Sequence, residues 1–260
     1  MQNLRRYGSR PFRVVVVHGG PGAAGEMAPV ARELASERGV LEPLQAAASV
    51  SGQIDELRAV LETSADLPVT LIGFSWGAWL SYLCSAYHPA LVQKLILVSS
   101  GPFEERYAAG IQTTRLSRLS ESERVEMHAL VEAMKDPTIP DKDALLARFG
   151  QLFTKADACD PAPLESEEPK VCWDIHARVW QEAAQWRGSG KLLALAERIA
   201  CPVLAIHGDY DPHPAEGVRE PLTRALRDFK LILLKHCGHK PWIEKQAADL
   251  FYKVLTDALS

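Results

Sequence analysis

The chain has 260 residues, of which 47% are hydrophobic and 24% are charged. This length and composition fit one large globular domain, or a core with a modest insertion, and exclude a fibrous or largely disordered protein. The 29 basic and 33 acidic residues leave a net charge of −4, which excludes the strongly basic surface expected of a nucleic-acid-binding protein.

The cysteines and the apolar segments restrict the cellular setting. The five cysteines are odd in number, lie far apart and include no Cys-x-x-Cys pair, so they predict neither a disulfide framework nor a zinc site. No apolar run approaches the roughly 18 residues of a membrane span, and no hydrophobic signal segment follows the charged N-terminus. We therefore expect a complete cytoplasmic protein without a membrane partner.

Short β-branched runs alternate along the chain with stretches of helical character. Val14–Val17 is too short for a buried helix and is closed by glycines, so it predicts a buried strand. Further strands are predicted at Val69–Gly73, Leu95–Ser99, Val203–His207, Leu231–Leu234 and, more weakly, Val40–Gln45. Helices are predicted at Gly25–Arg38, Gly52–Thr63, Trp76–Tyr87, Pro214–Leu226 and Lys240–Leu259. The alternation predicts an α/β fold, with a doubly wound, mostly parallel sheet between two layers of helices.

The segment 102–198 differs from the rest of the chain. It has almost no β-branched runs and many Glu and Arg residues, and it is interrupted at Asp136-Pro137 and Ile139-Pro140. These features predict a helical cap, or lid, inserted into the sheet domain. The expected division is therefore an α/β core formed by 1–101 and 199–260 and a cap formed by 102–198.

The strongest local signal is the pentapeptide Gly73–Gly77, which reads Gly-Phe-Ser-Trp-Gly between a predicted strand and a predicted helix. A serine on such a sharp strand-to-helix turn has its hydroxyl exposed, and the flanking glycines allow the close backbone approach that the turn needs. A serine hydroxyl is a poor nucleophile at neutral pH, so Ser75 needs a base, and the base needs an orienting acid.

Candidates for both partners follow later strands. Two aspartates, Asp209 and Asp211, follow one predicted strand, and two histidines, His236 and His239, follow the next. The carboxyl ends of parallel strands share one edge of a sheet, so residues that follow different strands can meet there. The chain order is therefore nucleophile, acid, base.

Four motifs in this order resemble the α/β-hydrolase fold superfamily of serine hydrolases, and they span the whole chain. They are HGGPG (His18–Gly22), GFSWGAW (Gly73–Trp79), HGDYDPHP (His207–Pro214) and GHKPWIE (Gly238–Glu244).

The resemblance implies a serine hydrolase that needs no cofactor, with Ser75 as the nucleophile. Asp211 matches the family's Gly-x-x-Asp spacing, and His239 matches its Gly-His pair. The resemblance therefore favours Asp211 as the acid and His239 as the general base, in preference to Asp209 and His236.

The motif His18–Gly22 closes the first predicted strand, and its glycines can turn an amide N–H toward the pocket. By the same resemblance, the oxyanion hole consists of the amides of Gly20 and Trp76. The segment Gly20–Gly25 also matches the G-x-G-x-x-G pattern of dinucleotide-binding proteins, with Glu42 as the nearby acidic residue. This match is isolated, so we expect no dinucleotide cofactor.

Within the superfamily, HGGPG and the tryptophan directly after Ser75 resemble in part the proline iminopeptidase branch, which removes N-terminal residues. Phe74 stands where that branch has a glycine, and only about ten residues precede the first predicted strand, which leaves little room for the branch's opening antiparallel strands. An aminopeptidase also needs a buried carboxylate for the substrate's ammonium group. Candidates in the predicted cap are Glu165, Glu167, Glu168 and Asp174.

Aromatic residues are the candidates for contacting a substrate. Trp173, Trp180 and Trp186 lie at spacings of seven and six, so two of them can share a helix face. With Trp76, Phe74 and Phe103 they could line an apolar acyl pocket under the cap, while plain packing of the cap on the sheet is the equal alternative. We expect a small hydrophobic ester, thioester or amide as substrate, or a short peptide in the iminopeptidase case. The sequence does not predict an oligomeric state.

Other functions known for this fold differ from a serine hydrolase in the type of nucleophile or in the presence of the triad residues. A dehalogenase or epoxide hydrolase of the same fold uses a carboxylate nucleophile, which Ser75 argues against. A non-catalytic binding protein would keep the fold without the three triad residues, and a cofactor-free peroxidase would share them. The other histidines show no metal-ligand spacing, so we expect no metal site.

Overall fold

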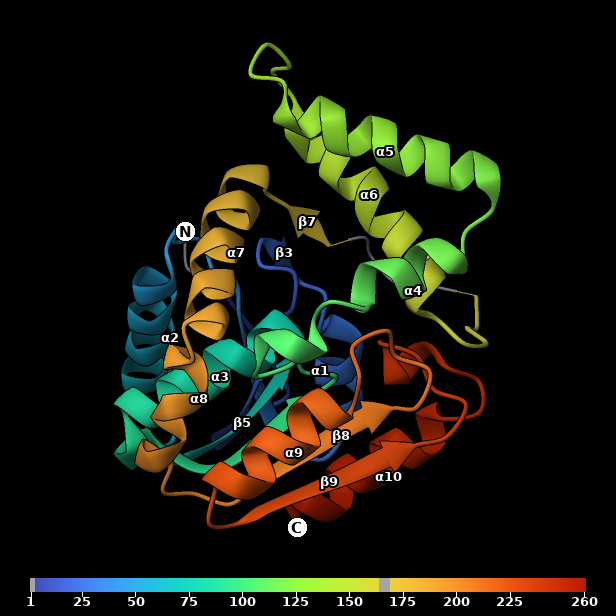
Figure 1. Cartoon of the computed structure of the whole chain (residues 1–260). Helices are drawn as coiled ribbons and strands as arrows, with labels where there is room; N and C mark the ends of the chain where they lie inside the picture. Colours follow the sequence, from blue (N-terminus) through green and yellow to red (C-terminus); the bar gives the residue numbers. More distant parts are fainter. Residues whose placement is uncertain (1–2, 164–168) are drawn as a thin grey trace.

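The structure, a computed structural model, describes residues 3–163 and 169–260 (Figure 1). Within these ranges seven strands pair into one sheet, and every pairing is parallel except that of β1 with β4. In spatial order the strands are β1 (Leu4–Tyr7), β4 (Gly39–Pro43), β2 (Phe12–Val17), β5 (Val69–Phe74), β6 (Val92–Val98), β8 (Val203–Gly208) and β9 (Phe229–Leu234). The predicted α/β class with a mostly parallel sheet is confirmed.

Two hydrophobic clusters lie on the two faces of this sheet. Val15 and Val17 of β2 enter one cluster, and Val14 and Val16 enter the other, because successive side chains of a strand point to opposite faces. The first cluster includes α2 (Val50–Ser64), α3 (Trp76–Tyr87) and α9 (Glu216–Ala225), and the second includes α1 (Ala28–Leu34) and α10 (Ala248–Leu259). The run of valines therefore fills both cores at once.

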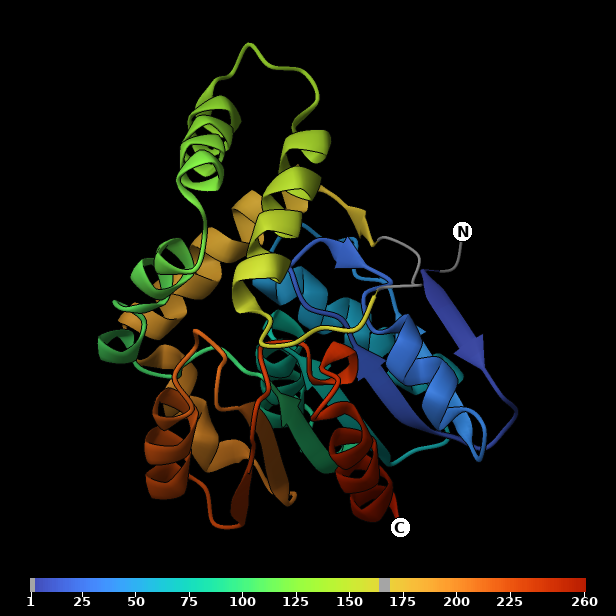
Figure 2. The same ribbon diagram turned by 90° about the vertical axis from the view of Figure 1, so that its right-hand side faces the viewer.

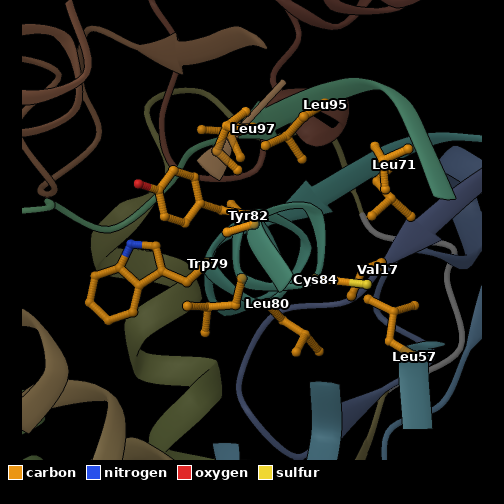
Figure 3. Close-up of a cluster of buried hydrophobic side chains, with 14 of the residues drawn as sticks. Val17, Leu57, Leu71, Trp79, Leu80, Tyr82, Cys84, Leu95 and Leu97 are labelled. Atoms are coloured by element: carbon orange, nitrogen blue, oxygen red, sulfur yellow. The ribbon is translucent and has the colours of Figure 1, made fainter. Parts of the chain in front are cut away.

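Helix α3 begins directly after Ser75 and is buried along almost its whole length. Trp79, Leu80, Tyr82 and Cys84 extend from it into the surrounding cluster (Figure 3). A helix that is apolar on all sides is stable only inside a protein, and this burial fixes the N-terminus of α3 at the edge of the sheet. Neither α3 nor any other helix in the described ranges is long and apolar enough to cross a membrane.

The chain between β6 and β8 is helical. A short turn η1 (Pro89–Leu91) precedes β6, and after that strand come η2 (Glu105–Tyr107), α4 (Ile111–Ser117), α5 (Glu121–Lys135), α6 (Lys142–Asp157), β7 (Lys170–Val171), α7 (Trp173–Gly188), α8 (Lys191–Ala194) and η3 (Leu195–Arg198). Helices α5 and α6 form a hairpin that projects from the body (Figure 1, Figure 2) and shares a small cluster that includes Met127 and Leu152. Helix α7 instead places Val179 and Ala183 in the first main cluster.

Two expected details are wrong. The residues before β2 do leave room for an antiparallel strand, because Leu4–Tyr7 is β1 and pairs with β4 at the edge of the sheet. The predicted helix Lys240–Leu259 is not continuous. Its first part is the turn η4 (Pro241–Ile243), and α10 begins only at Ala248, because the side chain of Glu244 turns inward to bind backbone amides of neighbouring loops.

Candidate active site

Ser75 lies on the turn between β5 and α3 with φ 53° and ψ −114°. A positive φ is strained for a serine, and the surrounding contacts must hold the turn in place. The amide of Ser75 donates to the carbonyl of Val98 at 3.0 Å, which ties the turn to β6. A Cβ on Gly73 would lie 2.1 Å from the carbonyl oxygen of Gly77, and a Cβ on Gly77 would lie 2.2 Å from that of Val17. The turn therefore depends on both glycines.

The structure brings Ser75, His239 and Asp211 together in one hydrogen-bonded series. Nδ1 of His239 lies 2.7 Å from Oδ2 of Asp211, and Nε2 of the same ring lies 3.1 Å from Oγ of Ser75. Because an ionised carboxylate can only accept, Nδ1 carries the hydrogen, Nε2 is bare, and the Ser75 hydroxyl donates to it. The alternative candidates lie elsewhere: His236 is exposed, and Asp209 accepts from a backbone amide of the next loop.

Asp211 is enclosed by protein, and its side chain is 0% exposed. Burial by itself would raise the pKa of Asp211, but the adjacent imidazoles of His239 and His213 and the hydrogen bonds they donate hold it well below its usual value. The carboxylate is therefore ionised at neutral pH. In that form it accepts from Nδ1 of His239 and so fixes the tautomer of that ring.

A second histidine, His213, binds the other oxygen of this carboxylate. Its amide and its Nδ1 each lie 2.9 Å from Oδ1 of Asp211. Asp211, His213 and His239 are also the one group of three potential metal ligands found in the described ranges. Both carboxylate oxygens already accept hydrogen bonds from these rings, so the group is a hydrogen-bonded network and not a preformed metal cage.

The loop after β2, residues 19–24, carries the predicted oxyanion donor Gly20. Gly20 has φ 104°, and a Cβ at this position would lie 2.6 Å from the Cβ of Ala23, so only glycine fits. Trp76 is the first residue of α3, where helix geometry leaves the amide N–H without an intrahelical partner. Both positions can present an N–H to a developing oxyanion.

The start of α7 holds this loop in place. Strand β7 pairs antiparallel with β3 (Ala23–Ala24), and the amide of Cys172 donates to the carbonyl of Gly22 at 2.9 Å. Nδ1 of His176 donates to the carbonyl of Gly20 at 2.9 Å. Burial lowers the pKa of His176, so its ring is neutral at pH 7. A segment far along the chain thus sets the conformation of the predicted oxyanion loop.

The end of α6 holds the loop that carries His239. The carbonyl of Asp157 accepts from the amide of His239 at 2.9 Å. Glu244 is 0% exposed, and its carboxylate accepts from the amides of Gly238 and Cys159 at 2.9 and 2.8 Å and from the next amide at 2.8 Å. The exit from α6 and the His239 loop are therefore fastened to one buried carboxylate.

Phe74 and Phe103, two of the predicted substrate contacts, are enclosed by other side chains. Their exposed fractions are 1% and 0%. The ring centroid of Phe74 lies 4.9 Å from that of His239, and the centroid of Phe103 lies 5.0 Å from that of Tyr82. Phe74 thus supports the imidazole of His239, and Phe103 packs in the core beside α3.

Trp173 and Trp180, the other two predicted contacts, lie on α7. Trp180 is 40% exposed and stacks on Trp79 with centroids 6.1 Å apart and planes 8° apart. Trp173 is half-buried beside the ring of His176. Of the candidates for an ammonium-binding carboxylate, Asp174 is exposed. The others, Glu165, Glu167 and Glu168, lie outside the described residues.

Three residues that hold the site together are not among the predicted site residues: His213, Glu244 and Asp157. His213 has a local signal, because a side-chain carboxylate that accepts from the amide two residues later is an Asx turn, and Asp211-Pro212-His213 has that spacing. Glu244 is an acidic residue directly after an apolar pair. Nothing local marks Asp157, because its contact with the His239 loop forms only in the folded chain.

Comparisons with known proteins concern the family and the fold. Residues 14–254 match the alpha/beta hydrolase family. The pimeloyl-[acyl-carrier protein] methyl ester esterase of Neisseria meningitidis serogroup A is 22% identical over 205 residues, covering 76% of this chain and 59% of that protein. The Nitrosomonas europaea esterase of the same name is 24% identical over 199 residues, covering 73% of each chain. This chain thus spans less than two thirds of the Neisseria protein.

Among solved structures, proline iminopeptidase from Mycobacterium smegmatis has a similar fold, with a TM-score of 0.66 and 18% identity over 98% of this chain and 93% of that one. At this identity the likeness concerns the fold alone. The family match covers nearly the whole sheet and the helices around it. The chain therefore belongs to the alpha/beta hydrolase family.

Proposed function

We propose that the protein is a serine hydrolase that cleaves a small, hydrophobic ester, thioester or amide through an acyl-enzyme. Ser75 is the nucleophile, His239 the general base, and Asp211 the orienting acid. The observation that carries the proposal is the hydrogen-bonded series from Oγ of Ser75 to Nε2 of His239 at 3.1 Å and from Nδ1 to Oδ2 of Asp211 at 2.7 Å. Its members follow three different strands of the sheet.

The first half-reaction forms the acyl-enzyme. As Oγ of Ser75 attacks the acyl carbon, its proton passes to Nε2 of His239, and the carbonyl oxygen becomes an oxyanion. The imidazolium then gives this proton to the leaving alcohol, thiol or amine as the bond to the acyl carbon breaks. In the second half-reaction a water molecule attacks the acyl carbon, His239 takes the water's proton, and Ser75 leaves with a proton returned from His239.

The amides of Gly20 and Trp76 are proposed to stabilise the oxyanion in both half-reactions. The support is the backbone shape of each position, a positive φ at Gly20 and the first position of a helix at Trp76. A preorganised donor of this kind contributes about 3–4 kcal/mol to the stability of the transition state. No further group is needed for the two steps.

The substrate class rests on the named activities of the relatives and on the aromatic residues of α7. Both curated relatives are methyl ester esterases. Trp180 and Trp173 are the two predicted contacts that keep accessible surface, so they are proposed to touch the acyl group or the leaving group. Phe74 and Phe103 are proposed to shape the site from beneath.

The test is turnover combined with covalent labelling. A fluorophosphonate should form an adduct on Ser75, identified by peptide mass spectrometry, and short-chain p-nitrophenyl esters should be hydrolysed. Ser75→Ala should lose both. Ser85→Ala is the matched control, because Ser85 is a buried serine of α3 whose hydroxyl donates to the carbonyl of Ser81. Labelling elsewhere, or hydrolysis that persists in Ser75→Ala, would contradict the proposal.

The second candidate is an aminopeptidase of the proline iminopeptidase type, favoured by HGGPG and by the likeness of fold. Hydrolysis of proline p-nitroanilide that is abolished in Ser75→Ala would favour it. Turnover of p-nitrophenyl esters without turnover of the anilide would favour the esterase. Both outcomes use the same nucleophile, and the ratio of the two kcat/KM values separates them.

A further inference from the structure

The carboxylate of Asp211 accepts hydrogen bonds from two imidazoles, one at each oxygen, and Nε2 of a third, His207, lies 3.5 Å from Oδ2. Oδ2 accepts from Nδ1 of His239 at 2.7 Å, and Oδ1 accepts from the amide and from Nδ1 of His213, each at 2.9 Å. The side chain of Asp211 is 0% exposed, so bulk water does not compete for either oxygen. The orientation of the carboxylate is therefore set by the protein alone.

The positions of the hydrogens follow from the acceptors. Because a carboxylate can only accept, Nδ1 of His213 carries the hydrogen and Nε2 of that ring is bare. The carbonyl of His213 accepts from Nε2 of His207 at 2.8 Å, which sets the tautomer of His207 as well. The hydrogen bonds thus run in one direction, from His207 through His213 to the carboxylate that orients His239.

The ring of His213 also lies against that of His239, with centroids 4.6 Å apart and planes tilted by 31°. Burial lowers the pKa of His213 to about 4, against the attraction of Asp211. The ring is therefore neutral at pH 7 and places no positive charge beside the imidazolium that forms on His239 during the reaction. The neutral ring of His213 can therefore donate to the carboxylate of Asp211 without disfavouring protonation of His239.

We propose that His213 is a positioning residue for the hydrolysis, whose Nδ1–H fixes the plane of the Asp211 carboxylate and so keeps Oδ2 directed at His239. This inference rests on the proposed function of Ser75, His239 and Asp211. The terminal torsion of an aspartate is broad, and the backbone amide of His213 by itself gives Oδ1 one donor, so the added Nδ1–H restrains the plane of the carboxylate further. Misplacement of a reacting group by about 1 Å costs about 100-fold in rate.

The experiment compares two substitutions at His213 in the full chain. His213→Ala removes the Nδ1–H and keeps the backbone amide that donates to Oδ1, and His213→Asn restores a side-chain N–H close to the position of Nδ1. On a short-chain p-nitrophenyl ester, kcat should fall about 10- to 100-fold in His213→Ala with KM within about twofold, because orientation acts after binding. His213→Asn should regain most of the loss. His236→Ala, at an exposed histidine three residues before His239, should match the parent.

A second readout needs no substrate. The Nδ1–H of His239 donates to a buried carboxylate and should give a low-field proton NMR signal in the parent protein and in His213→Asn. The signal should broaden or shift in His213→Ala, while circular dichroism shows that the variant remains folded. A parental kcat and an unchanged signal in His213→Ala would overturn the inference, as would equal losses of kcat in the Ala and Asn variants.

The two proposals fail in different ways. If the parent neither hydrolyses esters or anilides nor forms a phosphonate adduct on Ser75, the proposed function fails, and the NMR comparison still decides whether His213 orders the carboxylate. If the parent is active and His213→Ala is equally active, the role of His213 fails and the proposed function stands.

Discussion

Glycine is required beside Ser75 by the backbone of two neighbouring elements. A Cβ on Gly77 would lie 2.2 Å from the carbonyl oxygen of Val17 and 2.5 Å from that of His18, both at the end of β2. These atoms belong to a central strand and do not move as a flexible side chain would. The contact between α3 and β2 thus leaves no room for a side chain at this position.

We expect Gly77→Ala to lower the free energy of unfolding by about 3 kcal/mol, because β2 and α3 must separate to admit the methyl group. Urea unfolding followed by circular dichroism measures the change. Gly150→Ala is the matched control, since Gly150 lies within α6 with nothing within 4 Å of its Cβ position. That substitution should raise stability by up to about 1 kcal/mol through helix propensity. Equal unfolding midpoints for the two variants would contradict the argument.

Asp211 accepts hydrogen bonds at both oxygens. Replacing it by asparagine, which can accept at only one, therefore tests its role as the acid. In Asp211→Asn one oxygen becomes an NH₂ group that must face a donor, so His239 is driven to the tautomer that cannot take the proton of Ser75. We expect kcat to fall by about 10⁴-fold at neutral pH, measured with a p-nitrophenyl ester. Asp209→Asn changes the other candidate aspartate and should retain parental kcat. The reverse ranking would assign the acid to Asp209.

At the scale of elements, the turn from α6 and the loop before η4 meet at the carboxylate of Glu244. Its oxygens accept from three amides, of which two belong to the exit from α6 and one to Gly238. A Cβ on Gly238 would lie 2.1 Å from the carbonyl oxygen of Asp157, which shows how closely the two segments approach. The position of His239 therefore depends on the end of α6.

We expect Glu244→Gln to destabilise the protein by about 2–3 kcal/mol, because its NH₂ group would face a buried amide N–H and leave both without an acceptor. The value of kcat should fall as well, since the same amide contacts hold the loop of His239. Thermal unfolding and ester hydrolysis measure the two effects. Glu216→Gln, at an exposed glutamate of α9, should change neither. A parental Tm for Glu244→Gln would show that the three contacts contribute little.

An enclosed ion pair joins α4 to the end of α6. Arg115 and Asp157 form two hydrogen bonds at 2.7 and 2.6 Å, with side chains 12% and 6% exposed. Removing one partner leaves an enclosed charge uncompensated, whereas replacing both by apolar side chains of similar size is close to neutral. The pair therefore tests whether charge or packing stabilises this junction.

We expect Asp157→Leu alone to cost about 3–5 kcal/mol and the double variant with Arg115→Met to recover most of that loss. Urea unfolding of the two variants and of Arg115→Met measures the coupling. Lys135→Ala breaks an exposed pair with Glu132 and should change stability by less than about 0.5 kcal/mol. If the loss of stability in the double variant equals the sum of the two single losses, the stabilisation comes from the packing of each side chain and not from the ion pair.

At the scale of the whole molecule, three histidines around the site make the stability of the protein depend on pH. Burial lowers the pKa of His18, His176 and His213, in the last case to about 4. An unfolded histidine titrates near about 6.5. For His213, between about pH 6.5 and pH 4, the unfolded chain therefore binds a proton that the folded protein excludes, so stability falls as the pH falls, and His18 and His176 act in the same direction. Each such histidine contributes a slope of at most about 1.4 kcal/mol per pH unit.

We expect Tm to decrease from about pH 7 to about pH 5 and the decrease to be smaller in His213→Asn, which removes one of these groups. Differential scanning calorimetry over this range measures the slope. His236→Ala removes an exposed histidine from the loop of His239 and should leave the slope unchanged. A steeper decrease in His213→Asn would show that the asparagine disturbs the site by another route.

Much of the sheet and of the candidate site is predictable because its signals are local. The valine run of β2 and the turn around Ser75 are each encoded within a few residues, and parallel strands bring their carboxyl ends to one edge. The remainder depends on contacts distant in sequence. The pairing of β1 with β4, the inward turn of Glu244 and the contact of Asp157 with the His239 loop have no short-range pattern. Tertiary packing decides them.

The pairing of β3 with β7 joins the loop of Gly20 to the start of α7. Lifting α7 would break the hydrogen bonds of Cys172 and His176 to residues 19–24 and so release the loop of Gly20. Under the oxyanion role proposed for Gly20, a form of the protein with α7 lifted would lack that donor and would be inactive.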